Sequence, residues 1–236
     1  MSIHAIIPAA GVGVRMGGGM PKQFLSLEGV PIFVHTLRKF VDSDSINEIL
    51  LALRPEDMEH AQTDVDREHF SKPVRLVAGG ATRQETVARA LAEIPPTTSM
   101  VVVHDAVRPF IELDMIQRVV EAARKDGAAL LGIPSVDTVK QVERQIILGT
   151  IPRERIVLAQ TPQAFRYAII KEAFDRASAD GFNGTDESSL VERLGYNVTV
   201  LMGSDRNIKI TKPSDLPLAR LYIAQEKEQI KLKTIE

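Results

Sequence analysis

The chain of 236 residues contains no cysteine and no tryptophan, and it has only three tyrosines. Without cysteine it can form neither a disulfide scaffold nor a thiolate zinc site, and it has no cysteine nucleophile. The scarcity of aromatic side chains argues against a protein that stacks nucleic-acid bases on aromatic platforms. Lys and Arg number 29 against 31 Asp and Glu, so no global basic field attracts nucleic acid. If the protein binds an anion, local residues must hold it.

Long hydrophobic runs are also missing, although 44% of the residues are hydrophobic. No stretch approaches the ~18 consecutive apolar residues of a membrane span, so no membrane partner is predicted. The segment MSIHAIIPAAG has no basic n-region and runs directly into a glycine loop, which argues against a signal peptide. Together with the absence of cysteine, this predicts a reducing, cytoplasmic location. The length is typical of one large domain, which we expect to span residues 1–236.

Short apolar runs alternate along the chain with segments whose apolar residues repeat at helical spacing. This alternation predicts an α/β, Rossmann-like fold, in which a mostly parallel sheet carries helices on both faces. Ligands of such sheets bind beyond the carboxyl ends of the strands, so the loops after Ala9, Ala78 and His104 are candidate site loops. The predicted strands are Ile3–Ala9, Glu48–Leu53, Val74–Ala78, Met100–His104, Ala128–Ile133, Val198–Met202 and Asn207–Thr211.

Local signals predict structural roles for several residues. Thr82 and Glu85 have the spacing of a capping box at the start of a helix, and Gly127 is placed to end one. His104 beside an apolar strand is expected to be a buried structural residue. With His4 it indicates two neighbouring strands rather than a metal site, because no third ligand has suitable spacing.

The alternation breaks between about residues 134 and 163. Ser135–Val142 and Ile146–Ala159 are predicted to be extended around a polar tip at Glu143–Gln145. We interpret them as a β-arm that projects from the main sheet. Such an arm leaves an apolar patch, for which a second subunit is the natural cover. The residues of this patch are Val136, Val139, Ile146, Ile147, Leu148 and Ile151.

A loop of small residues, Pro8–Met16, follows the first predicted strand, and its backbone N–H groups could approach an anion closely. A dinucleotide fingerprint would need a third glycine at Met16 and an acid where Arg54 follows the second strand. A Walker A motif would need a lysine directly after its last glycine, and none stands there. A nucleoside triphosphate loop flanked by Arg15 and Lys22 remains, beside the alternative of a tight turn with two solvated cations.

The loop and the following Pro21–Leu25 resemble the signature of nucleotidyltransferases that activate phosphorylated or sugar substrates. Further segments narrow the resemblance to the 2-C-methyl-D-erythritol 4-phosphate cytidylyltransferase family of non-mevalonate isoprenoid precursor synthesis. Each segment is weak alone, but all follow the order of the family over roughly positions 3 to 220. These segments are Gly79–Val87, His104–Pro109, Asp137–Lys140, Ala159–Phe165, Gly184–Glu187 and Asn207–Thr211.

The resemblance implies an enzyme that moves CMP from CTP to a polyol phosphate and releases pyrophosphate. The catalytic residues it implies are Arg15 and Lys22, which would hold the α-phosphate, and Lys209, which would reach the acceptor phosphate. Mg²⁺, or another divalent cation, would bridge the phosphates, with Asp105 as a candidate protein ligand. Two alternatives stay open: a ribitol-5-phosphate cytidylyltransferase, and a nucleotide-binding regulator without turnover.

The resemblance also implies nucleotide contacts. The backbone of Gly79 and Gly80 would read the cytosine edge, and Thr86 would offer a hydroxyl. Ala81 departs from the acidic residue common in the family, so a side-chain contact is lost there. Arg83 could equally be a solvated arginine in a first helical turn. The predicted nucleotide-binding residues are Ala9, Ala10, Gly11, Gly13, Gly79, Gly80, Thr86 and Asp105.

Contacts to the second substrate are implied both in the body of the protein and on the arm. In the family, the arm interlocks with its twin in a homodimer, which implies that Thr138 and Arg153 complete the partner's pocket in trans. Arg155 is the other candidate for the arginine position, and Lys140 lies on the same arm. The predicted substrate-binding residues are Arg108, Thr138, Arg153, Thr161 and Thr185.

Overall fold

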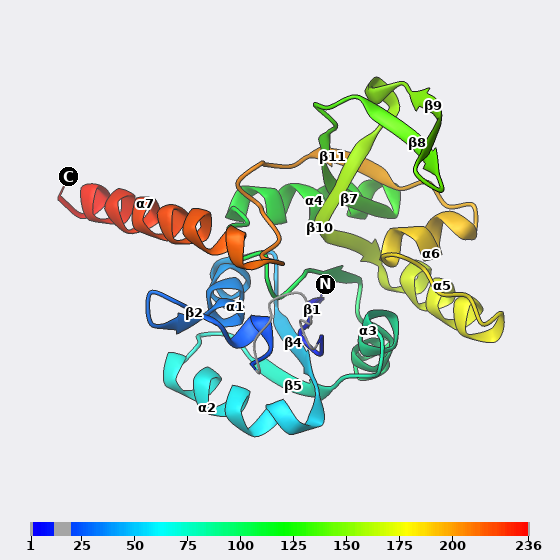
Figure 1. Ribbon diagram of the computed structural model, residues 1–236. Helices are drawn as coiled ribbons and strands as arrows, with labels where there is room; N and C mark the ends of the chain where they lie inside the picture. Colours follow the sequence, from blue (N-terminus) through cyan, green and yellow to red (C-terminus); the bar gives the residue numbers. More distant parts are fainter. Residues whose placement is uncertain (1, 12–19, 236) are drawn as a thin grey trace.

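The computed structural model describes residues 2–11 and 20–235, with side chains to residue 229. Its centre is a seven-stranded sheet in the order β11-β7-β10-β6-β1-β4-β5, with helices on both faces (Figure 1). All strands except β10 run parallel to one another, and β10 is antiparallel to both β6 and β7. The strands are β1 (Ile3–Pro8), β4 (Glu48–Leu53), β5 (Val74–Ala78), β6 (Met100–Val103), β7 (Ala128–Pro134), β10 (Val157–Arg166) and β11 (Thr199–Met202). The predicted α/β, Rossmann-like fold is therefore confirmed.

Successive side chains along each strand point to opposite faces of the sheet, and both sets are apolar, so both faces must be covered. On β1, Ala5 and Ile7 belong to one apolar cluster, whereas Ile6 belongs to another on the opposite face. Helices α1 and α4 pack into the first cluster, and α3, α5 and α6 pack into the second. The helices are α1 (Ile32–Asp42), α2 (Met58–Glu68), α3 (Arg83–Ala92), α4 (Leu113–Asp126), α5 (Tyr167–Ala179), α6 (Glu187–Arg193) and α7 (Leu216–Ile235).

Short elements join these layers. A small hairpin of β2 (Ser26–Leu27) and β3 (Val30–Pro31) precedes α1, and α7 extends away from the body (Figure 1). Within the described residues, no helix is long and apolar enough to span a lipid bilayer. The 3₁₀ turns are η2 (Lys22–Phe24), η3 (Pro55–Asp57), η4 (Arg153–Arg155) and η5 (Pro213–Asp215).

The arm is a hairpin of β8 (Val139–Glu143) and β9 (Ile146–Ile151) that stands away from the main sheet (Figure 1). It is shorter than the predicted segment of about 134–163. The turn η4 interrupts the second extended stretch, and the chain then enters the main sheet as β10. The predicted boundary was too wide because an apolar, extended sequence does not reveal which strand it will pair with.

The predicted strand over Asn207–Thr211 is wrong, because this segment forms no ladder with the sheet. A single backbone bond, from the N–H of Ile210 to the carbonyl of Val107, attaches it to the loop after β6. Neighbouring side chains of this segment still have different surroundings. Ile210 is fully buried, whereas Lys209 between its two isoleucine neighbours faces the pocket described below.

His104 has the structural role expected from the sequence. Its ring is completely buried at 4.9 Å from that of Phe40, and its Nε2 lies 3.0 Å from the carbonyl of Arg108. Among the described residues, Nδ1 has no hydrogen-bond partner. Burial therefore lowers the pKa of His104 to about 4, and the imidazole is neutral at physiological pH.

We expect the free energy of unfolding to fall as the pH is lowered from about 6.5 to about 4. In this window the unfolded chain binds a proton at His104 and the folded protein does not, a difference worth up to about 3 kcal/mol. Urea denaturation across this range should show a shallower pH dependence for His104→Gln. The control is His60→Gln, which replaces an exposed imidazole. Equal slopes in wild type and His104→Gln would contradict the assignment.

Candidate functional site

A cavity of about 170 Å³ lies at the carboxyl ends of β1, β5 and β6, the sheet edge predicted from the sequence. Five stretches of the chain that are distant in sequence contribute to its wall. Its lining residues are Pro8, Ala10, Gly11, Lys22, Gln23, Gly80, Ala81, Thr82, Arg83, Thr86, Asp105, Ala106, Val107 and Lys209.

Two of the three predicted catalytic cations, Lys22 and Lys209, line this same cavity. The third, Arg15, lies outside the described residues, as does the predicted nucleotide contact Gly13. The two lysines are 187 positions apart in the sequence, and the fold brings them together because η2 and the loop carrying Lys209 meet at the sheet edge. Two ammonium groups beside one cavity are suited to a ligand with several negative charges.

The loop after β1 presents backbone to the cavity. Ala10 and Gly11 line it, whereas Ala9 is buried and its carbonyl accepts a hydrogen bond of 2.6 Å from Nε2 of Gln23. Ala9 therefore fastens the loop to η2, and its contact with a nucleotide stays a prediction. Gly79 is needed for close packing, because a Cβ there would lie 2.8 Å from Cβ of Ala10.

Thr86 has a local role that the sequence did not predict. Its hydroxyl donates to the carbonyl of Thr82 at 2.8 Å and accepts from the N–H of Gly80 at 3.1 Å. The residue is almost completely buried. Thr86 thus holds the glycine turn in place, and its direct contact with a base stays a prediction.

The buried carboxylate of Asp105 contacts three cationic side chains. Its Oδ1 lies 3.2 Å from Nε of Arg83, and its Oδ2 lies 2.9 Å from Nζ of Lys209 and 3.4 Å from Nε of Arg108. The hydroxyl of Thr161 accepts a hydrogen bond from the backbone N–H of Asp105. Burial alone would raise the pKa of Asp105, but the charges of Arg83, Lys209 and Arg108 together hold it well below its usual range.

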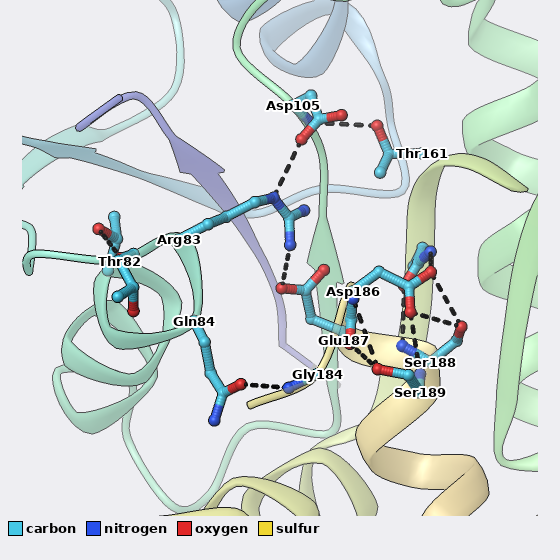
Figure 2. A network of polar contacts seen from close by, with 12 residues as sticks. Thr82, Arg83, Gln84, Asp105, Thr161, Gly184, Asp186, Glu187, Ser188 and Ser189 are labelled. Atoms are coloured by element: carbon cyan, nitrogen blue, oxygen red, sulfur yellow. Dashed lines mark hydrogen bonds and ion pairs between the residues drawn. The ribbon is translucent and has the colours of Figure 1, made fainter. Parts of the chain in front are cut away.

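Arg83 lies between two buried carboxylates, as Figure 2 shows. Beyond its contact with Asp105, its Nη1 is 2.6 Å from Oε1 of Glu187, a residue only 1% exposed. The interpretation of Arg83 as a solvated arginine is therefore wrong. The sequence places Glu187 in the family segment Gly184–Glu187, but nothing in the local pattern relates it to Arg83, which lies more than 100 residues earlier.

Of the predicted contacts to the second substrate, Arg108 and Thr161 have internal partners. Arg108 donates from Nη1 to the carbonyl of Asn207 at 2.7 Å, so it holds the loop that carries Lys209. Thr161 is buried beside Asp105, whereas Thr185 is exposed just before α6. The described cavity is lined by none of these three, and their substrate contacts stay predictions.

The arm residues Thr138, Lys140 and Arg153 are exposed and lie outside the lining of the described cavity. Arg153 donates from Nη1 to the carbonyl of Val136 at 2.7 Å, and Lys140 donates to the hydroxyl of Thr150. Within one chain, the arm is therefore not part of the wall around Lys22 and Lys209.

The described residues contain no group of three or more His, Asp or Glu side chains that could hold a metal ion. Asp105 is the single carboxylate in the lining of the described cavity, and cations contact both of its oxygens. Mg²⁺ in nucleotide sites is usually bound by one or two carboxylates together with phosphates and water. This donor set fits an ion carried mainly by the phosphates of a ligand.

Comparison with known proteins agrees with this geometry. The IspD family model, described as 2-C-methyl-D-erythritol 4-phosphate cytidylyltransferase, matches residues 3–225. Proteins of that name from Acidobacterium capsulatum and Solibacter usitatus are 52% and 51% identical over 235 and 237 residues, covering 95% and 96% of this chain and 98% and 97% of theirs.

Solved structures give the same assignment. The 4-diphosphocytidyl-2C-methyl-D-erythritol synthase of Anaerococcus prevotii superposes with a TM-score of 0.84 at 30% identity, covering 94% of this chain and 96% of that one. The 2-C-methyl-D-erythritol 4-phosphate cytidylyltransferase of Thermus thermophilus gives 0.75 at 36% identity, with 94% and 98% covered. The chain belongs to the 2-C-methyl-D-erythritol 4-phosphate cytidylyltransferase family.

Proposed function

We propose that this enzyme transfers CMP from CTP to 2-C-methyl-D-erythritol 4-phosphate and releases pyrophosphate. The observation that carries the proposal is the convergence of Lys22 and Lys209 on one cavity beside the glycine loop. Membership of the family over nearly the whole chain supports this substrate pair over ribitol phosphate and over a regulator without turnover.

In this reaction an oxygen of the acceptor phosphate attacks the α-phosphorus of CTP. The new bond joins that oxygen to the α-phosphorus, while the bond from the α-phosphorus to the bridging oxygen breaks and pyrophosphate leaves. The nucleophile is already an anion, so no strong general base is required. The protein must align two anions that repel each other and neutralise charge on the α-phosphoryl oxygens. Alignment alone can supply ~7 kcal/mol or more of barrier reduction.

The cations of the site meet this requirement. Lys209 is held at 2.9 Å from the buried carboxylate of Asp105, so its ammonium group is oriented before the substrates bind. Preoriented charge stabilises a transition state without the cost of reorganising the site during reaction. We assign the α-phosphate to Lys22 together with Arg15, and the acceptor phosphate and the transferring group to Lys209.

We further propose that Mg²⁺ enters with the triphosphate, with Asp105 as its candidate protein ligand. When bound, the ion supplies additional neutralisation of the phosphate charge. A location in the cytoplasm stays a prediction, and it rests on the absence of cysteine from the sequence.

We also propose that the enzyme is a homodimer joined through its arm. Ile146, Ile147 and Leu148 on the arm are 67%, 60% and 56% exposed in the single chain. Large apolar side chains left this exposed on a projecting hairpin are typical of an interface between proteins. A second copy that covers this patch would bring Thr138 and Arg153 toward the other chain's pocket, consistent with their place outside the described cavity of their own chain.

Mixed dimers are expected to show that Arg153 contributes to the pocket of the other chain. A dimer of one Arg153→Ala chain and one Lys22→Ala chain should regain about half of wild-type activity, because one pocket then has both wild-type residues. Each parent homodimer should be almost inactive. Differently tagged chains, purified as heterodimers and checked by light scattering, allow the measurement of pyrophosphate release. An inactive mixed dimer would show that Arg153 acts within its own chain, and a monomeric wild type would contradict the homodimer.

The proposed activity can be tested by measuring pyrophosphate release with Mg²⁺ for each of the four ribonucleoside triphosphates. Each is paired with 2-C-methyl-D-erythritol 4-phosphate or with ribitol 5-phosphate. Release should be fastest with CTP and methylerythritol phosphate. Release with ribitol phosphate alone would transfer the assignment to that acceptor. CTP binding without release on either acceptor would support the regulator instead.

A further inference from the structure

Two consecutive residues in the first turn of α3 contact the segment that leads into α6. Arg83 pairs with Glu187, while Gln84 accepts a hydrogen bond of 2.8 Å from the N–H of Gly184. Gln84 also donates from Nε2 to the carbonyl of Phe182 at 3.0 Å. Figure 2 shows Arg83 and Gln84 reaching this segment from the same helix end. Residues 182–187 are therefore fastened to α3 at two points.

This contact joins regions to which we assign different substrates. Thr82 and Arg83 line the nucleotide cavity, whereas Thr185 in the fastened segment is the predicted contact for the acceptor. A continuous line of charges runs from Glu187 through Arg83 to Asp105. A displacement of Glu187 would therefore change the position of Arg83 and, through it, that of the Asp105 carboxylate, which orients Lys209.

The burial of Glu187 indicates that its role is not simply to stabilise the fold. Its side chain is 1% exposed, and its Oε2 has no hydrogen-bond partner in the described part of the chain. A buried ion pair is often less stabilising than well-packed apolar residues would be, because both charges must be desolvated. The contact nevertheless fixes the direction of the Arg83 guanidinium, since that group has a second carboxylate, Asp105, on its other side.

We propose that Glu187 is a positioning residue that holds Arg83 in the nucleotide cavity and couples it to the acceptor segment. The proposal rests on the function proposed above. Glu187 itself does not line the described cavity, so it acts through Arg83. Because these contacts join the start of α6 to the first turn of α3, ordering one substrate site helps to order the other.

The test replaces Glu187 by glutamine, which keeps the size of the side chain and removes its charge. We expect KM for CTP and KM for the acceptor both to rise by about tenfold, within the usual range of coupling between sites. The change in kcat should be smaller. The Glu187→Gln, Arg83→Ala double variant should be no worse than Arg83→Ala alone, because Glu187 acts through that arginine.

The matched control is Asp180→Asn, which removes an exposed partner of Arg193 at the other end of α6. This control should keep wild-type KM values. Far-UV circular dichroism and thermal unfolding verify the fold of every variant. If Glu187→Gln does not fold, Glu187→Asp supplies the test, because it keeps the charge but shortens the reach to Arg83, and both KM values should again rise.

Unchanged KM values in folded Glu187→Gln, or independent losses in the double variant, would overturn the proposal. A loss of thermal stability with unchanged KM would likewise reduce Glu187 to a structural residue. Calorimetric titration of CTP into wild type and Glu187→Gln separates this proposal from the proposed function. Tenfold weaker CTP binding by the variant would support positioning even if the wild-type enzyme did not turn over, and equal affinities would refute it.

Discussion

Replacement of Lys22 by alanine is expected to lower kcat for CMP transfer by about 100-fold or more while leaving the fold intact. Removal of one preoriented group that neutralises transition-state charge typically costs a factor of about 10² to 10³ in kcat. Lys22 lines the cavity through the short turn η2, so truncating its side chain removes charge without opening the core. Steady-state release of pyrophosphate measures the effect.

The effect should fall mainly on kcat rather than on KM for CTP, because charge on the α-phosphoryl group develops in the transition state. Lys22→Arg should recover part of the loss, since it restores a positive charge but not the same geometry. Lys171→Ala is the matched control, as this lysine lies on the surface of α5 beside Asp175. A kcat within threefold of wild type in Lys22→Ala would exclude Lys22 from the catalytic site.

Replacement of Asp105 by asparagine should cause the largest loss of stability of any single polar substitution considered for this site. The change leaves Arg83, Arg108 and Lys209 grouped around a neutral side chain. Removal of one partner from a buried ion pair typically costs about 3–5 kcal/mol of unfolding free energy. Activity should fall as well, because Lys209 loses the carboxylate that orients it. Urea denaturation measures the first effect and pyrophosphate release the second.

The stability difference between wild type and Asp105→Asn depends on pH in a definite direction. Because the folded protein lowers the pKa of Asp105, its carboxylate contributes stability at pH values above the pKa of the unfolded chain, near 4. The gap between wild type and Asp105→Asn should thus be full at pH 7 and shrink only below about pH 4. The control Asp175→Asn, in an exposed pair with Lys171, should have a much smaller effect. A gap that narrowed between pH 7 and 5 would show that another group is responsible.

Features fixed by neighbouring residues were predictable. Thr82 begins α3 by accepting the N–H of Glu85, and Gly127 ends α4 with a φ of +99°. Such signals act within one helical turn, so the sequence contains both partners of each contact. The buried parallel strands β1, β4, β6 and β7 were also predictable, because continuous apolar runs are required where both faces of a parallel sheet are covered.

Features that depend on distant pairing were harder to predict. The sequence around Lys209 is typical of a strand. In the described part of the chain, however, no strand pairs with this segment, and it lies as a loop beside the end of β6. The predicted arm of about residues 134–163 includes the hairpin but is too long, because its last residues belong to β10, which pairs with β6 and β7. Periodicity predicts that a segment is extended, but it does not identify its hydrogen-bond partner.

By itself, the sequence determined the α/β alternation, the loop ends at which a ligand would bind, and the presence of an exposed apolar arm, because each depends on local periodicity or on residue type. Only the tertiary structure decided that Asp105 gathers three cations and that Arg83 links it to Glu187. Electrostatic interactions depend on distance in space and on burial, and neither is encoded in the spacing of residues along the chain.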